Sequence, residues 1–389
     1  MNPTSPMNST NSMNPTDPRN PADDQRFMRI ALGLARKGEG ETNPNPIVGA
    51  VVVKDGHIVG EGYHHSFGGP HAEVFALDEA GDAARGATLY VTLEPCSHHG
   101  KTPPCTERII AAKIARVIIA CRDPNPLVNG HGIEKMRAAG IEVTEGVLEE
   151  EARRANEIFF KFITTGRPFV QLKLAESLDG KIATRTGDAK WVSGADSRAE
   201  VHRLRRRFAA VLVGVGTVVS DDPRLTVRHV AGRDPLRIVL DGRGRIPLAA
   251  TLLREEGRTI VVTATMAREK EEALLSLGIE VWRPPGNEGN IDLLAFLQRL
   301  GEENIDSLLV EGGGETAAAF LEASLVDKVA FFIAPILIGG RDAIPTIGGT
   351  GAEQVSEALH LKWVEVERIG EDLLVTGYPE RGNASSASS

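Results

Sequence analysis

Four side chains between His71 and Cys105 have the types and spacing that a catalytic zinc site needs. The motifs G-P-H-A-E and T-L-E-P-C-S-H-H-G-K-T-P-P-C supply one imidazole, two thiols and one carboxylate. Catalytic zinc sites typically use three protein ligands and leave the fourth position for water. His71, Cys96 and Cys105 can fill those three positions, which leaves Glu73 free to move protons.

This division of ligands and base is typical of zinc deaminases, in which H-x-E is followed by P-C-x-x-C. Zinc lowers the pKa of bound water toward neutrality, and a nearby carboxylate can then carry the proton to a ring nitrogen and to leaving ammonia. The spacing departs from that pattern, because eight residues separate Cys96 from Cys105. Gly100, Pro103 and Pro104 predict that this insert loops out and returns the second thiol to the metal.

A closed structural zinc site is the alternative interpretation of the same motifs. His98 or His99 would then be the fourth ligand, and Glu73 would have no role. His64 and His65 could also bind metal, although a surface or substrate-contacting position is the favoured interpretation for both.

The elements that must position these residues alternate between helix and strand. Apolar spacing predicts a helix over 24–37, and two apolar runs flanking Asp55-Gly56 predict a hairpin. We then expect a helix over 71–84, a strand over 87–92, a helix over 105–112 and a strand over 115–120. This order implies a mixed sheet covered by helices. His71, Glu73 and Cys105 then lie in first turns, where the helix N-terminus should favour a thiolate at Cys105.

Length and composition predict a globular protein of two domains. The chain has 389 residues, with 41% hydrophobic and 25% charged residues. A net charge of -9 argues against a general nucleic-acid binder. Its 3 cysteines form no disulfide framework, and no apolar run approaches the length of a bilayer span, so we expect a cytoplasmic protein with no membrane partner. Cys121 follows an apolar run, as expected of a buried structural thiol.

The polar ends and one linker set the expected domain boundaries. Residues 1–22 are polar and proline-rich without an apolar signal segment, and residues 381–389 are rich in Ser and Ala, so both predict disordered tails. T-T-G-R-P at 164–168 is typical of a short linker. We therefore expect a zinc domain over 23–165 and a second domain over 169–380.

The second domain alternates apolar strands with helical stretches, which predicts a largely parallel sheet. Its expected strands include 209–213, 236–240, 259–263 and 307–310. V-L-V-G-V-G-T-V-V lacks the third glycine of a dinucleotide-binding fingerprint and is weak evidence. In S-L-L-V-E-G-G-G-E-T, glycines 312–314 would let backbone N–H groups approach a phosphate at a helix N-terminus. A tight turn without a ligand is the alternative.

G-Y-H-H-S-F-G-G-P-H-A-E, V-T-L-E-P-C-S-H-H-G-K-T-P-P-C and D-P-N-P closely resemble the deaminase half of the bifunctional riboflavin biosynthesis family. That family has the same widened cysteine spacing. The resemblance implies a cytidine-deaminase-like α/β/α domain with one zinc ion per chain. It further implies a phosphoribosylated diaminopyrimidinone substrate, contacted by Asn45, His64 and Lys101.

L-K-L-A-E-S-L-D-G-K-I-A, W-V-S-G, G-V-G-T-V-V-S-D-D-P-R-L-T-V-R and L-V-E-G-G-G-E-T resemble the reductase half of the same family, so the match runs from about Asp23 to Tyr378. The implied fold is an α/β domain like dihydrofolate reductase, which explains the weak Rossmann fingerprint. The implied NADPH contacts are Ala175, Trp191, Thr217, Asp221, Gly313, Gly314, Glu315, Thr316, Ala317, Ala318 and Ala319. The implied substrate contacts are Ala189, Arg205, Leu225, Arg228 and Glu311.

Three of the charged side chains in this second half have roles that their chemistry suggests. Arg205 and Arg228 suit a ribose phosphate, because a guanidinium pairs bidentately with phosphate oxygens. For the run R-L-R-R-R at 203–207, a solvated or subunit-facing surface is the alternative for at least two arginines. Lys173 is expected to orient or polarise the opened sugar while the cofactor supplies hydride, with a structural ion pair as the alternative. Asp179 has no role that the sequence decides.

The resemblance as a whole implies an enzyme that deaminates a pyrimidine ring and then reduces a ribosyl side chain to ribityl, as a dimer or tetramer of one chain. Two alternatives stay open on the residues alone. One is a nucleoside, base or RNA-editing deaminase joined to an unrelated α/β domain. The other is a non-catalytic zinc module with a nucleotide-binding domain.

Overall fold

The computed structural model describes residues 20–97, 103–125, 128–190, 192–287 and 289–380. The chain divides between Phe160 and Lys161 into two compact units, unit 1 and unit 2. Most of the two tails expected to be disordered lies outside the described residues, as do Lys101, Trp191, His98 and His99. The tail predicted over residues 1–22 ends too late, because the first helix begins at Pro21. The Asn20 side chain caps this helix by accepting a hydrogen bond from the backbone N–H of Ala22.

Unit 1 is built on one five-stranded sheet in the order β2-β1-β3-β4-β5. Its strands are β1 (Gly49–Lys54), β2 (His57–Tyr63), β3 (Thr88–Leu93), β4 (Arg116–Cys121) and β5 (Glu142–Glu145). The pairs β1–β2 and β1–β3 are antiparallel, whereas β3–β4 and β4–β5 are parallel, which confirms the mixed sheet. The hairpin turn lies at Asp55 and Gly56, whose φ angles of 50° and 77° are those that a two-residue turn between twisted strands requires.

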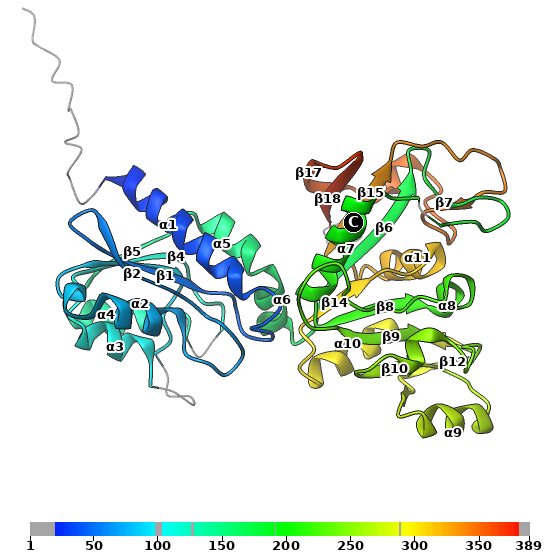
Figure 1. The fold of residues 1–389 in the computed structure, drawn as a ribbon, viewed down its shortest axis with the longest axis horizontal. Coiled ribbons are helices and arrows are strands. Elements are labelled where there is room, and N and C mark those ends of the chain that lie inside the picture. The colour runs from blue at the N-terminus through cyan, green and yellow to red at the C-terminus, as the bar shows by residue number, and fades with distance from the viewer. Residues whose placement is uncertain (1–19, 98–102, 126–127, 191, 288, 381–389) are drawn as a thin grey trace, which may run out of the picture. The chain divides into compact units, whose positions relative to one another are not determined.

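Helices cover both faces of this sheet, as Figure 1 shows, with α1 and α5 on one face and α2, α3 and α4 on the other. Their bounds are α1 (Pro21–Ala35), α2 (Ala72–Ala80), α3 (Cys105–Ala111), α4 (His131–Ala138) and α5 (Glu149–Ala155), with the 3-10 turns η1 (Arg36–Gly38) and η2 (Gly81–Ala84). The helix expected over 71–84 is therefore α2 followed by η2, because the chain leaves the α conformation at Gly81. Helix α6 (Glu157–Thr165) spans the division between the units.

Unit 2 is built on a nine-stranded sheet in the order β11-β10-β9-β8-β14-β6-β15-β18-β17. The strands are β6 (Phe169–Ser177), β8 (Ala210–Gly214), β9 (Leu236–Leu240), β10 (Thr259–Val262), β11 (Glu280–Trp282), β14 (Ser307–Val310), β15 (Lys328–Ala334), β17 (Leu361–Ile369) and β18 (Asp372–Pro379). Pairing is parallel from β11 to β15 and antiparallel between β15, β18 and β17. The largely parallel sheet is confirmed, and β9 and β14 have the expected bounds.

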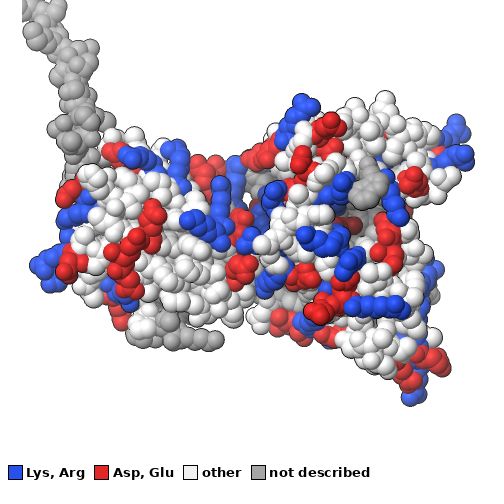
Figure 2. Space-filling view, viewed as in Figure 1, with Lys and Arg blue, Asp and Glu red and all other residues white. Residues whose placement is uncertain are grey.

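Shorter elements complete unit 2. They are α7 (Ala195–Arg207), α8 (Val215–Asp221), α9 (Arg268–Ser276), α10 (Leu293–Glu302), α11 (Gly314–Glu322), the 3-10 turns η3 (Thr251–Arg254) and η4 (Val355–Glu357), and the short strands β7 (Lys181–Ala183), β12 (Gly286–Asn287), β13 (Asn290–Ile291) and β16 (Ile344–Pro345). Across the described ranges, no helix combines the length and apolarity of a membrane span. On the face that Figure 2 shows, basic and acidic side chains are interspersed over the surface.

One buried polar cluster ties α1 to the sheet of unit 1. The Asp24 carboxylate, 5% exposed, accepts hydrogen bonds from the Tyr90 hydroxyl at 2.9 Å and from both terminal nitrogens of Arg116 at 3.1 and 2.9 Å. Arg116 also lies 3.5 Å from Glu142, which is half exposed. A carboxylate can be buried only with hydrogen-bonding and charged partners, and Tyr90 and Arg116 supply these for Asp24.

Asp24→Ala should therefore lower the free energy of unfolding of unit 1 by about 3 kcal/mol, because it leaves a buried guanidinium and a buried hydroxyl without their acceptor. Urea unfolding followed by circular dichroism measures this loss. Glu142→Gln is the matched control, since an exposed partner of the same arginine contributes less than about 1 kcal/mol. Equal losses in the two variants would contradict this account of the cluster.

Candidate active sites

His71, Cys96 and Cys105 come together in unit 1 as a group of potential metal ligands. Their ligand atoms all lie within 4.8 Å of one another. The His71 Nδ1 atom is 3.2 Å from the Cys105 sulfur and 3.6 Å from the Cys96 sulfur. One imidazole and two thiols at this separation are a donor set that suits zinc. Among the described residues, neither His64 nor His65 belongs to this group, in contrast to the alternative left open above.

Glycines in β2 set the position of the helix that carries His71 and Glu73. A methyl group built on Gly60 would lie 2.1 Å from the carbonyl oxygen of Ala76, and one on Gly62 would lie 2.3 Å from that of Ala72. Only glycine permits α2 to lie this close to the strand. His71 is the N-cap of α2 and Glu73 lies in its first turn, so His71 precedes the turn in which it was expected.

The two cysteines come from different elements, and the one favoured as a thiolate differs from the expectation. Cys96 follows β3, and Cys105 is the first residue of α3. The backbone N–H of Cys105 donates to the Cys96 sulfur at 3.3 Å. The Cys105 thiol lowers the pKa of Cys96 most, and the His71 ring and this backbone bond act in the same direction, whereas the Cys96 sulfur and burial raise the pKa of Cys105. A thiolate is therefore favoured at Cys96, and the expectation of a thiolate at Cys105 is wrong, because the Cys105 thiol is the donor to its neighbour.

His71 and Cys96 line a cavity of about 210 Å³ that is also lined by the predicted base and two predicted substrate contacts. Glu73 is 3% exposed, and burial raises its pKa, so this carboxyl is suited to accept and return a proton. The Asn45 side-chain nitrogen lies 3.2 Å from His64 Nε2, and His64 Nδ1 lies 3.0 Å from the Pro70 carbonyl. Since burial lowers the pKa of His64, its ring is neutral, with Nδ1 donating and Nε2 accepting.

Glu94, Asp123 and Asn125 also line this cavity, and the residue-by-residue prediction omitted them. The buried Glu94 carboxylate accepts hydrogen bonds from the backbone N–H groups of Gly130, Gly132, Ile133 and Asp123 at 3.0 to 3.4 Å. It therefore ties the segment after β4 and the start of α4 to the cysteine loop. The motif D-P-N-P after a buried strand was the signal available in the sequence for Asp123 and Asn125.

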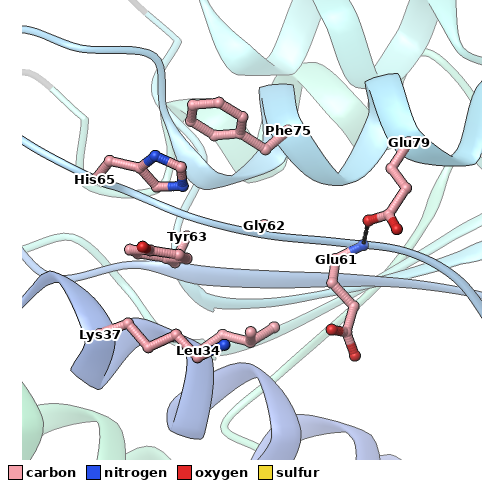
Figure 3. A pocket seen from close by; sticks show the side chains of 8 residues that line it. All are labelled: Leu34, Lys37, Glu61, Gly62, Tyr63, His65, Phe75 and Glu79. Atoms are coloured by element: carbon pink, nitrogen blue, oxygen red, sulfur yellow. Dashed lines mark hydrogen bonds between the residues drawn. The ribbon is translucent and has the colours of Figure 1, made fainter.

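His65 lies outside this cavity, in a separate surface hollow of about 390 Å³ that Figure 3 shows. Its ring stacks on Phe75 at 4.2 Å between centroids and contacts Tyr63 at 4.0 Å. At the edge of the hollow, the backbone N–H of Glu61 donates to Glu79. Adjacent histidines on one strand end thus face different environments, and His65 is the surface residue of the two.

In unit 2, Lys173, Arg205 and Glu311 form one buried charge cluster. Arg205 donates to both Glu311 oxygens, from Nε at 2.7 Å and from Nη2 at 2.8 Å, and Lys173 Nζ lies 4.0 Å from Glu311. Burial raises the pKa of Glu311, but the charge and hydrogen bonds of Arg205 outweigh it and leave this pKa low. Burial also disfavours the charged form of Lys173 and lowers its pKa. The structure thus contains the ion pair that was the alternative for Lys173, on the wall of a predicted substrate site.

The glycine-rich turn after β14 is hydrogen-bonded to Thr217, another predicted cofactor contact. The backbone N–H of Gly313, the N-cap of α11, donates to the Thr217 hydroxyl at 3.1 Å. A methyl group on Gly312 or Gly214 would lie 2.7 or 2.3 Å from the Thr316 side chain, so the turn is as tight as its glycines suggested. The expected cofactor residues 314–319 form the first turns of α11, Ala175 lies in β6, and Asp221 ends α8.

The predicted substrate residues Leu225 and Arg228 lie on a segment that several residues fix. Leu225 has a φ of 58°, which is rare for a side chain of its size. Arg205 Nη1 donates to the Thr226 carbonyl at 3.1 Å, and the Val227 N–H donates to Asp234 at 2.7 Å. Each of the three guanidinium nitrogens of Arg205 thus donates one hydrogen bond within the protein, so Arg205 helps to place its neighbours.

Two further predicted residues lie apart from this cluster. Asp179 accepts hydrogen bonds from the Ser177 hydroxyl and from the backbone N–H groups of Ile338 and Gly339, which lower its pKa to about 2. Asp179 therefore anchors the segment after β15. Ala189 lies in the exposed segment between β7 and α7.

Comparisons with known proteins agree with the division into units. A model of the cytidine and deoxycytidylate deaminase zinc-binding region matches residues 21–121, and a model of the RibD C-terminal domain matches residues 168–375. The fold and these matches define a zinc-binding deaminase domain joined to a reductase domain like dihydrofolate reductase. The second match contradicts the alternative in which the C-terminal domain is unrelated.

The full-length comparisons identify the family. The riboflavin biosynthesis protein RibD of Aquifex aeolicus is 50% identical over 90% of this chain and 97% of its own length, and that of Escherichia coli is 42% identical over 90% and 98%. A solved deaminase/reductase from Thermotoga maritima is 43% identical, with a TM-score of 0.83 over 92% of this chain and 99% of its own. The chain belongs to the RibD family, the bifunctional deaminases and reductases of riboflavin biosynthesis.

Proposed function

We propose that unit 1 deaminates 2,5-diamino-6-(5-phosphoribosylamino)pyrimidin-4-one and that unit 2 then reduces its ribosyl side chain to ribityl with NADPH. The Thermotoga maritima relative is named for this pair of activities, as a diaminohydroxyphosphoribosylaminopyrimidine deaminase and a 5-amino-6-(5-phosphoribosylamino)uracil reductase. One observation carries the first half: His71 and Cys96, two of the three grouped ligands, line the same cavity as Glu73, Asn45 and His64.

His71, Cys96 and Cys105 would hold one zinc ion, which when bound supplies a water of low pKa. The buried Glu73 carboxyl would accept a proton in this cavity and return it to the ring nitrogen and to the departing ammonia. Asn45 and the neutral His64 are joined by a hydrogen bond and orient the ring in the cavity. We retain Lys101 as a proposed phosphate contact, although it lies outside the described residues.

Glu73→Gln should lower deaminase turnover about a thousandfold, because the amide cannot accept and return a proton. Metal analysis should still find one zinc per chain, and the rate of NADPH oxidation by the reductase should be unchanged. Cys96→Ser should lose the zinc itself, whereas the matched control Cys121→Ser should keep it. Full turnover by zinc-loaded Glu73→Gln would refute the role of Glu73.

For the reductase, the glycine-rich turn at Gly313 and the Thr217 hydroxyl support an NADPH phosphate site. We propose cofactor contacts from Ala175, Trp191, Thr217, Asp221 and residues 313–319, with the cofactor supplying the hydride when bound. Lys173 lies beside Glu311 in the buried cluster and would polarise the opened sugar carbonyl or imine. Ala189, Leu225 and Arg228 would complete the substrate site.

Lys173→Met should lower the reductase kcat at least about a hundredfold, because the cluster loses the ammonium group proposed to polarise the carbonyl or imine. Deaminase activity on the same chain is the internal control and should stay unchanged. NADPH binding, followed by fluorescence, separates chemistry from folding and should change little. Wild-type kcat in this variant would reduce Lys173 to a structural ion pair.

We also propose that the chain acts in the cytoplasm as a homo-oligomer, a dimer or tetramer. All three cysteines are free thiols. β17 is the edge strand of the nine-stranded sheet and exposes Trp363 (53%), Val364 (51%) and Val366 (60%). Uncovered apolar edges favour association. Two such edges could pair in an isologous interface between two copies of the chain.

Val366→Glu should reduce the mass found by sedimentation velocity at micromolar concentration, because it places a further negative charge on an exposed edge that already carries Glu365 and Glu367. Leu275→Glu is the matched control, since Leu275 is 54% exposed on α9, away from β17. An unchanged oligomer in Val366→Glu, or a loss equal to that of the control, would exclude β17 as the interface.

A further inference from the structure

His202 is a buried histidine of unit 2 to which the proposed reaction gives no role. It lies on α7 and is 4% exposed, one turn before Arg205 on the same buried face. Its Nδ1 atom accepts the backbone N–H of Arg228 at 3.1 Å, and its ring meets that of His229 edge-on at 4.5 Å. An imidazole that accepts at Nδ1 is neutral and carries its proton on Nε2.

The charges around this ring keep it neutral. Burial lowers the pKa of His202 to about 4, and Arg205, His229 and Arg228 act in the same direction, while only Glu311 opposes them. A second proton would therefore add a cation to a group of cations, and it would also occupy the atom that Arg228 needs as an acceptor. His202 thus serves as a fixed acceptor at neutral pH.

Arg228 differs from the other arginines around it in having no acidic partner. Arg205 is paired with Glu311, and Arg224 is paired with Glu255. Arg228 forms no ion pair within the described part of the chain, and its Nη1 donates to the Thr226 hydroxyl at 2.9 Å. Burial lowers the pKa of Arg228, and Arg205 and Arg224 act in the same direction more strongly than Glu255 and Asp234 oppose them. A bound anion would therefore stabilise this guanidinium.

We propose that His202 is a positioning residue of the reductase: it holds the backbone of Arg228 so that the guanidinium meets the substrate phosphate. This inference rests on the proposed contact between Arg228 and that phosphate. The bond from Arg228 to His202 joins α7 to the segment 225–229, and Arg205 joins the same two elements at Thr226. Helix α7 therefore holds the segment that carries Arg228 through two residues, His202 and Arg205.

The test compares His202→Leu, which removes the acceptor, with His202→Asn, whose side-chain oxygen can replace Nδ1. His202→Leu should raise the reductase KM for the phosphorylated substrate about tenfold with kcat within about twofold, as expected for lost positioning of a charged contact. His202→Asn should restore KM to within about threefold of wild type. NADPH binding and deaminase activity should match wild type in both, which a general loss of structure would not allow. If His202→Leu does not fold, His202→Ala takes its place in the comparison.

Arg228→Gln separates this inference from the proposed contact on which it rests. An unchanged KM in Arg228→Gln would overturn the phosphate contact itself. A raised KM in Arg228→Gln with an unchanged KM in His202→Leu would overturn the role of His202 and leave the contact standing. The double variant should have the KM of Arg228→Gln alone, because both changes remove one interaction, and additive effects would also overturn the inference.

Discussion

Parallel pairing of strands is the constraint on which both candidate sites depend. In a parallel sheet the carboxyl ends of neighbouring strands meet at one edge, so residues far apart in sequence lie together there. In unit 1, β3 and β4 are parallel neighbours, and their ends lead to Glu94 with Cys96 and to Asp123 with Asn125. In unit 2, β14 and β8 are parallel neighbours, and their ends lead to Glu311 with Gly313 and to Thr217. The same backbone rule assembles a zinc-type donor set in one unit and a charged cluster in the other.

Much of this arrangement could be predicted because its signals are local. A buried strand is a short apolar run, so β9 and β14 were expected with the bounds that the structure has. Imidazole, thiol and carboxylate groups at a particular spacing are chemically distinctive, and the structure brings His71, Cys96 and Cys105 within ligand distance of one another. The hairpin at Asp55-Gly56 was predictable for the same reason, since few residues accept its backbone angles.

The rest depends on hydrogen bonds between residues that no local pattern connects. Glu94 accepts from Gly130, 36 positions away, and Arg205 pairs with Glu311, 106 positions away. The sequence suggested phosphate as the partner of Arg205, because a guanidinium suits phosphate and carboxylate equally well. Only the fold shows which anion is already beside it. In the same way, the preference for a thiolate at Cys96 follows mainly from the contact between the two sulfurs, which the fold brings together from separate elements.

The segment that carries Leu225 and Arg228 has a consequence for the energetics of recognition. Thr226, Val227 and Arg228 are each held by a separate hydrogen bond, to Arg205, Asp234 and His202. Loops that become ordered only around a ligand lose conformational entropy at that moment, and the loss weakens binding. Here the loss occurs when unit 2 folds, before any substrate arrives. If this segment contacts the substrate phosphate as proposed, its hydrogen bonds should make that contact depend little on the flexibility of the surrounding chain.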